Sequence, residues 1–240
     1  MSVKSKNLSV VTPSRRAAKD RPPLSRDRAL RAAVWLADEG GLAAVTMRAV
    51  AAALQVEAMS LYHHVSGKAD LLDGMVDVVF AEFTVPVAGS PWRSQMRGRC
   101  SSVRRVLGVH GWAVGLLDSR SQPGPATLRH HDAVLGCLRA DGFSVSEAGS
   151  AIAVLDAFTY GFAVQERSLP VGPGESEGDL TAAIVAAMPA GAYPHLVELA
   201  TERVMQPGYD FGDEFEVGLA LVLDGLAHLP GPSARPPAPS

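Results

Sequence analysis

The stretch 46–68, TMRAVAAALQVEAMSLYHHVSGK, decides the fold of this 240-residue chain. The hydroxyl of Thr46 can cap a helix, and apolar residues recur behind it at helical spacing as far as Leu54. The chain must turn at Gln55, and the helix that follows, over about 58–64, is too short to be stable alone. We therefore expect neighbouring helices to hold it, as they hold the recognition helix of a helix-turn-helix protein.

A longer helix precedes this pair, over about 28–41. Its leucine, valine and alanine residues share one face, Ser25 can cap it, Asp27 suits its first turn, and Gly40-Gly41 ends it. Three helices of this size, the last two joined by a short turn, form a helix-turn-helix domain. The sequence thus predicts a DNA-binding domain over 25–70.

The first helix, ending in Gly40-Gly41, is followed by Val45-Thr46-Met47-Arg48, Leu54-x-Val56, Ser60-Leu61-Tyr62-x-His64-Val65 and Lys68-x-Asp70-Leu71-Leu72. Through these segments, residues 26–83 resemble the N-terminal domain of the TetR family of one-component bacterial repressors. The sequence departs from the family pattern at two positions, because many relatives have Gly where this chain has Gln55 and often a polar base reader where it has Ala58. Gln at such a turn is somewhat strained, since glycine alone adopts positive φ without steric cost. Both departures leave the binding class intact but make the operator sequence unreadable.

The resemblance and side-chain chemistry together predict the phosphate contacts. Tyr62 would donate its hydroxyl to a phosphate. Lys68 would add positive charge to a helix N-terminus, which already attracts anions. Thr46 and His64 are further candidates for phosphate contact.

The base-reading candidates lie between these groups. Arg48 is the best of them, because arginine can bind guanine O6 and N7 in a bidentate way. Ala58, Met59 and Ser60 start the recognition helix and would face the bases, the first two by packing on thymine methyl groups. His63 would contact both backbone and bases.

Each of these residues also has a purely structural interpretation. Tyr62 could be a half-buried aromatic with a solvated hydroxyl, and Lys68 alone is more often a solvated charge. His63 and His64 could be surface residues or a metal pair, but adjacent residues on a helix point about 100° apart and cannot easily share one ion. We predict no metal and no cofactor.

The distribution of charge supports DNA binding even though the whole chain carries −3. Residues 1–70 hold 11 Lys/Arg and 6 Asp/Glu, a net charge of +5, whereas residues 71–240 hold 11 and 19, a net charge of −8. The positive part coincides with the predicted DNA reader. Its affinity for DNA should fall as salt rises, through counterion release.

Both ends of the chain have the composition of tails. Residues 1–24 carry six Lys or Arg without an apolar period, which predicts a flexible basic arm that reaches along the DNA backbone or into the minor groove. An idle disordered tail fits the same residues equally well. Residues 230–240 are predicted to be a disordered tail by composition.

From Leu71 onward the chain reads as successive helices, and no alternating run suggests a sheet, so the predicted fold class is all-α. We expect a loop over 170–179, rich in Gly, Pro and Glu. The five arginines of the 92–109 helix are expected to point mostly outward. The expected helices cover about 71–83, 92–109, 111–117, 123–138, 145–166, 193–205 and 211–227.

Residues 71–229 are predicted to form a ligand-binding and dimerisation domain. The helices at 145–166 and 211–227 are apolar over much of their circumference, and such helices are buried on two sides. Two of them from each of two chains would make a four-helix bundle, and hence a homodimer. One thick monomeric core is the alternative. Residues 92–228 resemble the C-terminal domain of tetracycline-repressor type, through Phe158-Thr159-Tyr160-Gly161-Phe162, Glu166 and Phe211-x-x-x-Phe215-x-x-Gly218-Leu219.

A regulator needs an input, and we expect a pocket for a small-molecule effector between the helices of this domain. Apolar and aromatic residues with occasional polar groups are the candidates, although any one of them fills a core more often than it contacts a ligand. These candidates are Met96, Cys100, His110, Trp112, Leu116, His131, Leu135, Phe158 and Phe162, with Trp92 nearby.

The sequence therefore predicts a ligand-responsive, homodimeric repressor that binds a palindromic double-stranded DNA operator. The alternatives are a helical protein-interaction adaptor and an all-α enzyme that uses His110 or His131 with Asp118 or Asp132. The enzyme is disfavoured because no G-x-S-x-G, H-E-x-x-H, P-loop or G-x-G-x-x-G motif occurs.

The expected location is the cytoplasm, with no membrane partner. No apolar run reaches 18 residues, and the N-terminus lacks the apolar segment of a signal peptide. The two cysteines are too few for a disulfide framework.

Overall fold

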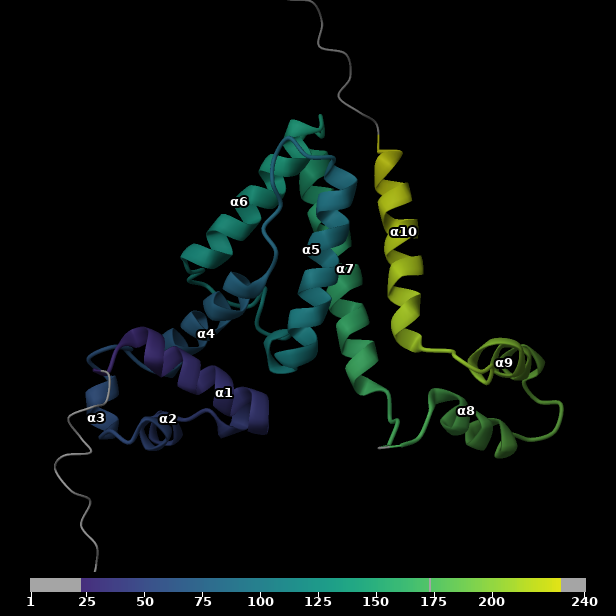
Figure 1. Cartoon of the computed structure of the whole chain (residues 1–240), viewed down its shortest axis with the longest axis horizontal. Helices are drawn as coiled ribbons and strands as arrows, with labels where there is room; N and C mark the ends of the chain where they lie inside the picture. Colours follow the sequence, from purple (N-terminus) through teal and green to yellow (C-terminus); the bar gives the residue numbers. More distant parts are fainter. Residues whose placement is uncertain (1–22, 173, 230–240) are drawn as a thin grey trace, which may run out of the picture.

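The computed structural model describes residues 23–172 and 174–229, and every regular element in these two ranges is helical (Figure 1). This confirms the predicted all-α class. Within the same ranges, no helix combines the length and hydropathy needed to cross a bilayer. The expected N-terminal arm, except for its last two residues, and the expected C-terminal tail lie outside the described residues.

Four helices form the N-terminal end of the molecule, at the lower left of Figure 1. The side chains of Ser25 and Thr46 accept hydrogen bonds from the backbone N–H of Arg28 and Ala49, so both predicted caps are present. Gly41 leaves the helical conformation at φ 69°, and a last turn follows it. The four helices are α1 (Arg26–Ala44), α2 (Met47–Leu54), α3 (Ala58–Leu61) and α4 (Lys68–Glu82).

Helix α4 belongs to two hydrophobic cores. Its first half places Leu71 and Met75 in the core of the N-terminal helices, and its second half places Val79 and Phe80 in a core with α5 and α7. At Gly74 a β-carbon would lie 2.5 Å from the side chain of Leu30, so glycine permits the close approach of α4 to α1. The predicted domain boundary between residues 70 and 71 falls inside this helix and stays a prediction.

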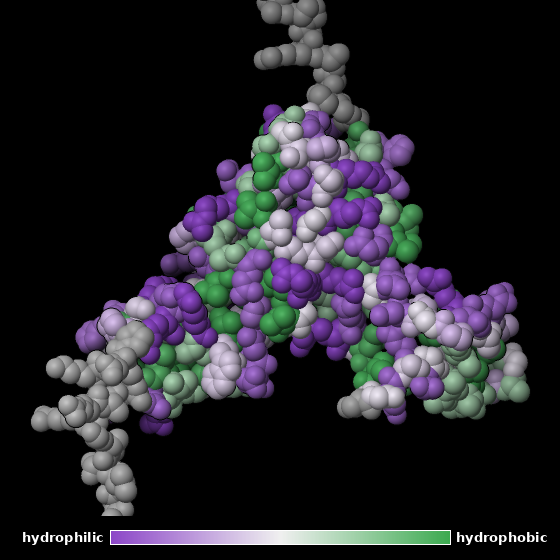
Figure 2. All heavy atoms as spheres, in the orientation of Figure 1, coloured by the Kyte–Doolittle hydropathy of each residue, from purple (hydrophilic) through white to green (hydrophobic). Residues whose placement is uncertain are grey.

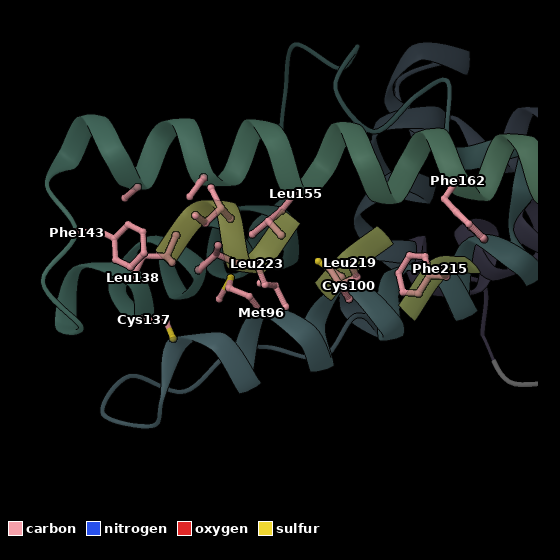
Figure 3. Packing of buried hydrophobic residues seen from close by; sticks show 14 residues of the cluster. Met96, Cys100, Cys137, Leu138, Phe143, Leu155, Phe162, Phe215, Leu219 and Leu223 are labelled. Carbon is pink, nitrogen blue, oxygen red and sulfur yellow. The ribbon is translucent and has the colours of Figure 1, made fainter. Parts of the chain in front are cut away.

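The C-terminal part is a bundle of long helices that stand side by side in Figure 1. Phe215, Leu219 and Leu223 of α10 pack against α7, which contributes Leu155 and Phe162 (Figure 3). Met96 and Cys100 of α5 and Val134, Cys137 and Leu138 of α6 complete this core. The bundle consists of α5 (Trp92–Val109), α6 (Pro125–Ala140), α7 (Val145–Ser168) and α10 (Glu214–Ala227).

Three sequence-based boundaries are wrong. The expected 111–117 helix contains only the 3-10 turn Gly111–Ala113. The expected loop over 170–179 ends early, because Ser176 and Asp179 form a capping box that starts α8 (Glu177–Ala186), a helix we did not predict. The expected 193–205 helix divides into α9 (Pro194–Leu199) and the π-helical turn Ala200–Val204. Helices α8 and α9 project from the bundle at the lower right of Figure 1.

Candidate DNA interface and effector site

The turn between α2 and α3 is built on a left-handed residue. Gln55 adopts φ 56° and ψ 46°, and it is the one residue other than glycine with positive φ among the described residues. Its N–H donates to the carbonyl of Ala52, which closes the last turn of α2. The departure from the family pattern at this position is therefore accommodated by backbone strain rather than by a different turn.

Helix α3 has only four residues, and the core holds it. Leu61 is completely buried, and Val65 just beyond it is 1% exposed. On the outer side, Met59 is 74% exposed and Tyr62 is 48% exposed, with His63 also exposed. An apolar anchor beneath and an exposed methionine, tyrosine and histidine above are the features of a short recognition helix.

The other predicted DNA contacts lie around α3 with different exposure. Arg48 on α2 is exposed, whereas Ala58, Ser60 and His64 are half-buried. Ala58 also packs against the N-terminal core, which reduces the part of its side chain that can face a base.

Two of the predicted phosphate contacts, Thr46 and Lys68, are exposed at the starts of α2 and α4. The Thr46 Oγ accepts from the Ala49 N–H at 3.0 Å, so its own hydroxyl hydrogen remains for a phosphate oxygen. Lys68 is exposed in the first turn of α4, and its N-cap, Gly67, provides no side-chain acceptor for the free N–H groups. A basic side chain next to uncapped N–H groups suits an anion.

An ion pair that the sequence analysis missed fixes this arrangement. Arg26 donates to both carboxylate oxygens of Asp70, at 3.0 and 2.5 Å, and to the carbonyl of His64 at 3.1 Å. Asp70 also accepts from the Ser66 N–H at 2.7 Å. The Arg26 guanidinium lowers the pKa of Asp70 to about 2. The pair therefore ties the end of the recognition segment and the start of α4 to α1.

In the described part of the chain, the effector-site candidates divide between the core of the bundle and its junction with the N-terminal helices. Met96, Cys100 and Phe162 are buried in the apolar core of the bundle, and Phe158 packs against it. Leu135 is 37% exposed.

The remaining candidates lie where the N-terminal helices meet the bundle. His110 Nδ1 and Trp112 Nε1 both lie 2.7 Å from Asp38 Oδ1 of α1. His131 Nδ1 lies 2.8 Å from the Thr127 carbonyl. Leu116 packs against the core that the second half of α4 forms with α5 and α7. As effector contacts, all nine candidates stay predictions.

An open cleft occurs elsewhere. It has a volume of about 530 Å³ and lies where α1 and α4 meet residues 122–129. None of the predicted effector contacts lines it. Its wall carries Asp27, Asp70, Asp73 and Asp77, so it is acidic and lies between the two parts of the molecule.

Two of these aspartates connect α4 to the bundle. Asp77 Oδ1 accepts from the Thr127 N–H at 2.8 Å and from its hydroxyl at 3.0 Å, which caps the first turn of α6. Asp73 Oδ1 accepts from Arg120 Nε at 2.5 Å. These contacts join the start of α6 and the segment before it to α4, and α4 packs in the same core as Leu61 of α3.

The bundle also contains a buried polar cluster that the sequence analysis missed. Arg99 is completely buried, although we expected the arginines of its helix to point mostly outward. Its Nε donates to His130 Nε2 at 3.1 Å, and its Nη1 lies 2.5 Å from Asp156 Oδ1. The hydroxyl of Tyr160 is buried beside them. No periodicity marks such a cluster, because its members come from three helices.

A short, exposed helix after a tight turn, joined through α4 to a helical bundle, is the arrangement of a helix-turn-helix DNA-binding protein with a regulatory domain. Residues 29–75 match the sequence model for bacterial regulatory proteins of the tetR family, and residues 85–229 match the tetracyclin repressor-like C-terminal domain. The chain belongs to the TetR family of transcriptional regulators, as the resemblance implied.

Similar proteins agree with this assignment. An HTH-type transcriptional regulator of Saccharopolyspora erythraea is 40% identical over 139 residues, a match that spans 56% of this chain and 59% of that protein. The HTH-type transcriptional repressor DrrR1 of Streptomyces coeruleorubidus is 32% identical, over 86% of this chain and 78% of its own length. The crystal structure of the Streptomyces coelicolor TetR family protein ActR in complex with (S)-DNPA superposes with a TM-score of 0.71 at 29% identity, and covers 86% of this chain and 98% of that one. The family matches and these similar proteins confirm the general function predicted from the sequence, a ligand-responsive DNA-binding repressor.

Proposed function

We propose that this protein binds a palindromic operator as a homodimer and leaves it when a small molecule binds within the α5–α7 bundle. The observation that carries the proposal is the α3 surface, where an exposed Met59, Tyr62 and His63 stand above a fully buried Leu61. An exposed methionine, tyrosine and histidine on and just after a short helix that the core anchors suit contact with a DNA groove.

The proposed roles at the DNA follow from position and chemistry. Tyr62, Thr46 and Lys68 contact phosphates, and His64 supports them. Arg48 reads a base edge, since it is exposed on the helix that precedes the turn. Met59 packs on thymine methyl groups, with Ala58, Ser60 and His63 as further contacts.

The dimer is proposed from the free faces of α7 and α10. Val154 and Val164 on α7 are each 47% exposed, and Val217 and Leu221 on α10 are 54% and 69% exposed. Figure 2 shows hydrophobic surface along the free side of α10. Two copies that bury these faces form a four-helix bundle, and the resulting two-fold symmetry matches a palindrome.

A regulator suits the described residues better than an enzyme does. The histidines of the enzyme alternative are engaged in contacts between helices: His110 with Asp38, and His131 with the Thr127 carbonyl and the ring of Phe80. Both cysteines are buried free thiols, which fits the reducing cytoplasm we propose as its location.

The test is a gel shift of the purified full-length protein on the DNA upstream of its own gene, at two salt concentrations. We expect a discrete complex that weakens as salt rises, and weaker binding by the Tyr62→Phe and Lys68→Ala variants. Each lost phosphate contact should cost about 1 kcal/mol, or about fivefold in affinity. Asp132→Ala, an exposed change on α6, is the control and should bind as the wild type does.

Size-exclusion chromatography with light scattering tests the dimer. Leu221→Arg should shift the protein towards monomer and weaken operator binding, whereas Asp132→Arg, an exposed change on α6, should have a much smaller effect. For the gel shift, unchanged operator affinity of both Tyr62→Phe and Lys68→Ala would show that the phosphate assignments are wrong.

A further inference from the structure

We propose that Arg99, with His130 and Tyr160, forms the polar end of the effector site and binds the carboxylate of an aromatic acid. This inference rests on the proposed function and identifies the chemical class of the effector. The three residues lie on α5, α6 and α7. The nine effector contacts predicted from the sequence include no arginine or lysine, so none of them could bind an acid in this way.

Hydrogen-bond donors outnumber acceptors in this cluster. A guanidinium has five N–H donors and no acceptor, and here only Nε makes a hydrogen bond. Nη1 lies 2.5 Å from Asp156 Oδ1, and the Cys100 thiol and the Tyr160 hydroxyl also lie beside the guanidinium, so three polar groups face two nitrogens that carry four N–H donors. A buried charged donor without a partner costs more than the roughly 1–3 kcal/mol of a neutral one.

His130 adds a further donor. Because a guanidinium can only donate, the Nε2 that receives its hydrogen bond must be unprotonated, which places the ring hydrogen on Nδ1. Burial and the neighbouring Arg99 lower the pKa of His130 to about 3, so the ring stays neutral at physiological pH. Its Nδ1 is buried and has no partner in the described residues, and the same is true of the Tyr160 hydroxyl.

An acceptor-only ligand resolves this imbalance. A carboxylate provides two oxygens in the planar geometry that a guanidinium binds best. Asp156 offers one carboxylate for this purpose and the Tyr160 oxygen can accept from Arg99, but His130 Nδ1 is left without an acceptor. The buried Arg99–Asp156 pair is also a poor source of stability, since desolvation offsets much of its attraction.

The surroundings favour an aromatic body for this acid. The His130 ring is in edge contact with Phe80 and Phe83, at centroid distances of 5.6 and 5.4 Å, and Phe80 also contacts the ring of His131. Flat aromatic rings pack well against such edges. Phe80 lies on α4, so a ligand that packs against Phe80 acts directly on the helix that follows the recognition helix.

The position also explains how binding would reach the DNA. Arg99 is completely buried, so an acid reaches it only when α6 and α7 separate from α5. The first turn of α6 is bound to α4 through Asp77 and Thr127. Binding therefore selects a conformation in which α4 has moved, which is what release from an operator requires.

The experiment compares matched acid and amide probes by isothermal titration calorimetry on the full-length protein. The pairs are benzoate and benzamide, 2-naphthoate and 2-naphthamide, and anthraquinone-2-carboxylate and its carboxamide. We expect at least one acid to bind tenfold or more tightly than its amide. The preference should vanish in the double variant Arg99→Met/Asp156→Leu.

A second ion pair between the same two helices provides the control. Arg104 of α5 pairs with Glu166 of α7 near the surface, so Arg104→Met/Glu166→Leu makes the same change of charge outside the cluster. It should keep the acid preference. The single variant Asp156→Asn should bind the preferred acid several-fold more tightly, because it removes the carboxylate that competes for Arg99. This gain does not depend on whether the double variant folds.

Equal binding of acid and amide across all three pairs would overturn the proposal, as would an acid preference that survives the loss of Arg99. If the protein binds its operator and only neutral compounds release it, the repressor function stands and the Arg99 assignment falls. If no operator is bound at low salt, the proposed function itself fails, and the gel shift reports this independently of the calorimetry.

Discussion

Asp70 at the start of α4 is bound by Arg26 at the start of α1, with its two carboxylate oxygens 3.0 and 2.5 Å from the guanidinium. The same arginine reaches the carbonyl of His64, the residue that ends the recognition segment. The pair therefore determines how α3 and Lys68 are presented together. Its value is positional, since side chains this exposed contribute modestly to stability.

Asp70→Asn should weaken operator binding and lower stability by about 1 kcal/mol, because one charge-assisted pair is lost. Binding is measured by gel shift and stability by urea unfolding. Asp27→Asn is the matched control, since it removes the same charge from an exposed i,i+4 pair on α1. Equal loss of DNA affinity in both variants would mean that net charge, and not the position of Lys68, is responsible.

Gln55→Gly should raise stability by about 0.5–1 kcal/mol, because glycine adopts φ 56° without the steric cost that glutamine has there. Gln55→Ala shortens the side chain but keeps the β-carbon, so it should bring no gain. Thermal unfolding compares the three proteins. Equal stability of the glycine and alanine variants would show that the turn stores no backbone strain.

The N-terminal domain was predictable because its signals are local. A Thr46 cap, the spacing of apolar residues up to Leu54 and the pattern around Tyr62 all lie within one short stretch, and the structure places them as expected. The Arg26–Asp70 pair was not predictable in this way, since its members are 44 positions apart.

The regulatory domain was harder to predict for two physical reasons. The sequence of α8 lacks the periodic apolar face on which helix prediction depends, and accordingly none of its residues is buried. Arg99 is buried only because His130 and Asp156 arrive from two other helices, and no pattern on its own helix reveals them. Local spacing identifies helices, but it does not identify which polar groups meet inside a bundle.

Asp77→Ala should lower stability by about 1 kcal/mol, because the first turn of α6 loses the acceptor that caps Thr127. Gly124, the N-cap of α6, has no side chain to replace it. Amide hydrogen exchange in the first turn of α6 should become faster in this variant. The control variant Asp132→Ala, at an exposed position of α6, should leave the exchange rates there unchanged. Unchanged protection at Thr127 would show that α4 does not hold α6 through this contact.

Replacing His130 should change how stability depends on pH. Its folded-state pKa is lowered to about 3 from an ordinary value of 6.5, chiefly by burial and next by the Arg99 charge. Between these pH values the unfolded chain binds a proton that the folded chain does not, so acid favours unfolding and stability rises with pH across this window.

This single group should cost the wild type about 2–3 kcal/mol on going from pH 6.5 to pH 4.5. His130→Gln retains an oxygen that can accept from Arg99 but cannot titrate, so its stability should fall by that much less over the same interval. Urea unfolding at a series of pH values measures the difference. His195→Gln, at a side chain that is 95% exposed, should keep the wild-type dependence. If the two variants lose stability in parallel as the pH falls, the neutral, buried state of His130 is wrong, and with it the assignment of the ring hydrogen to Nδ1.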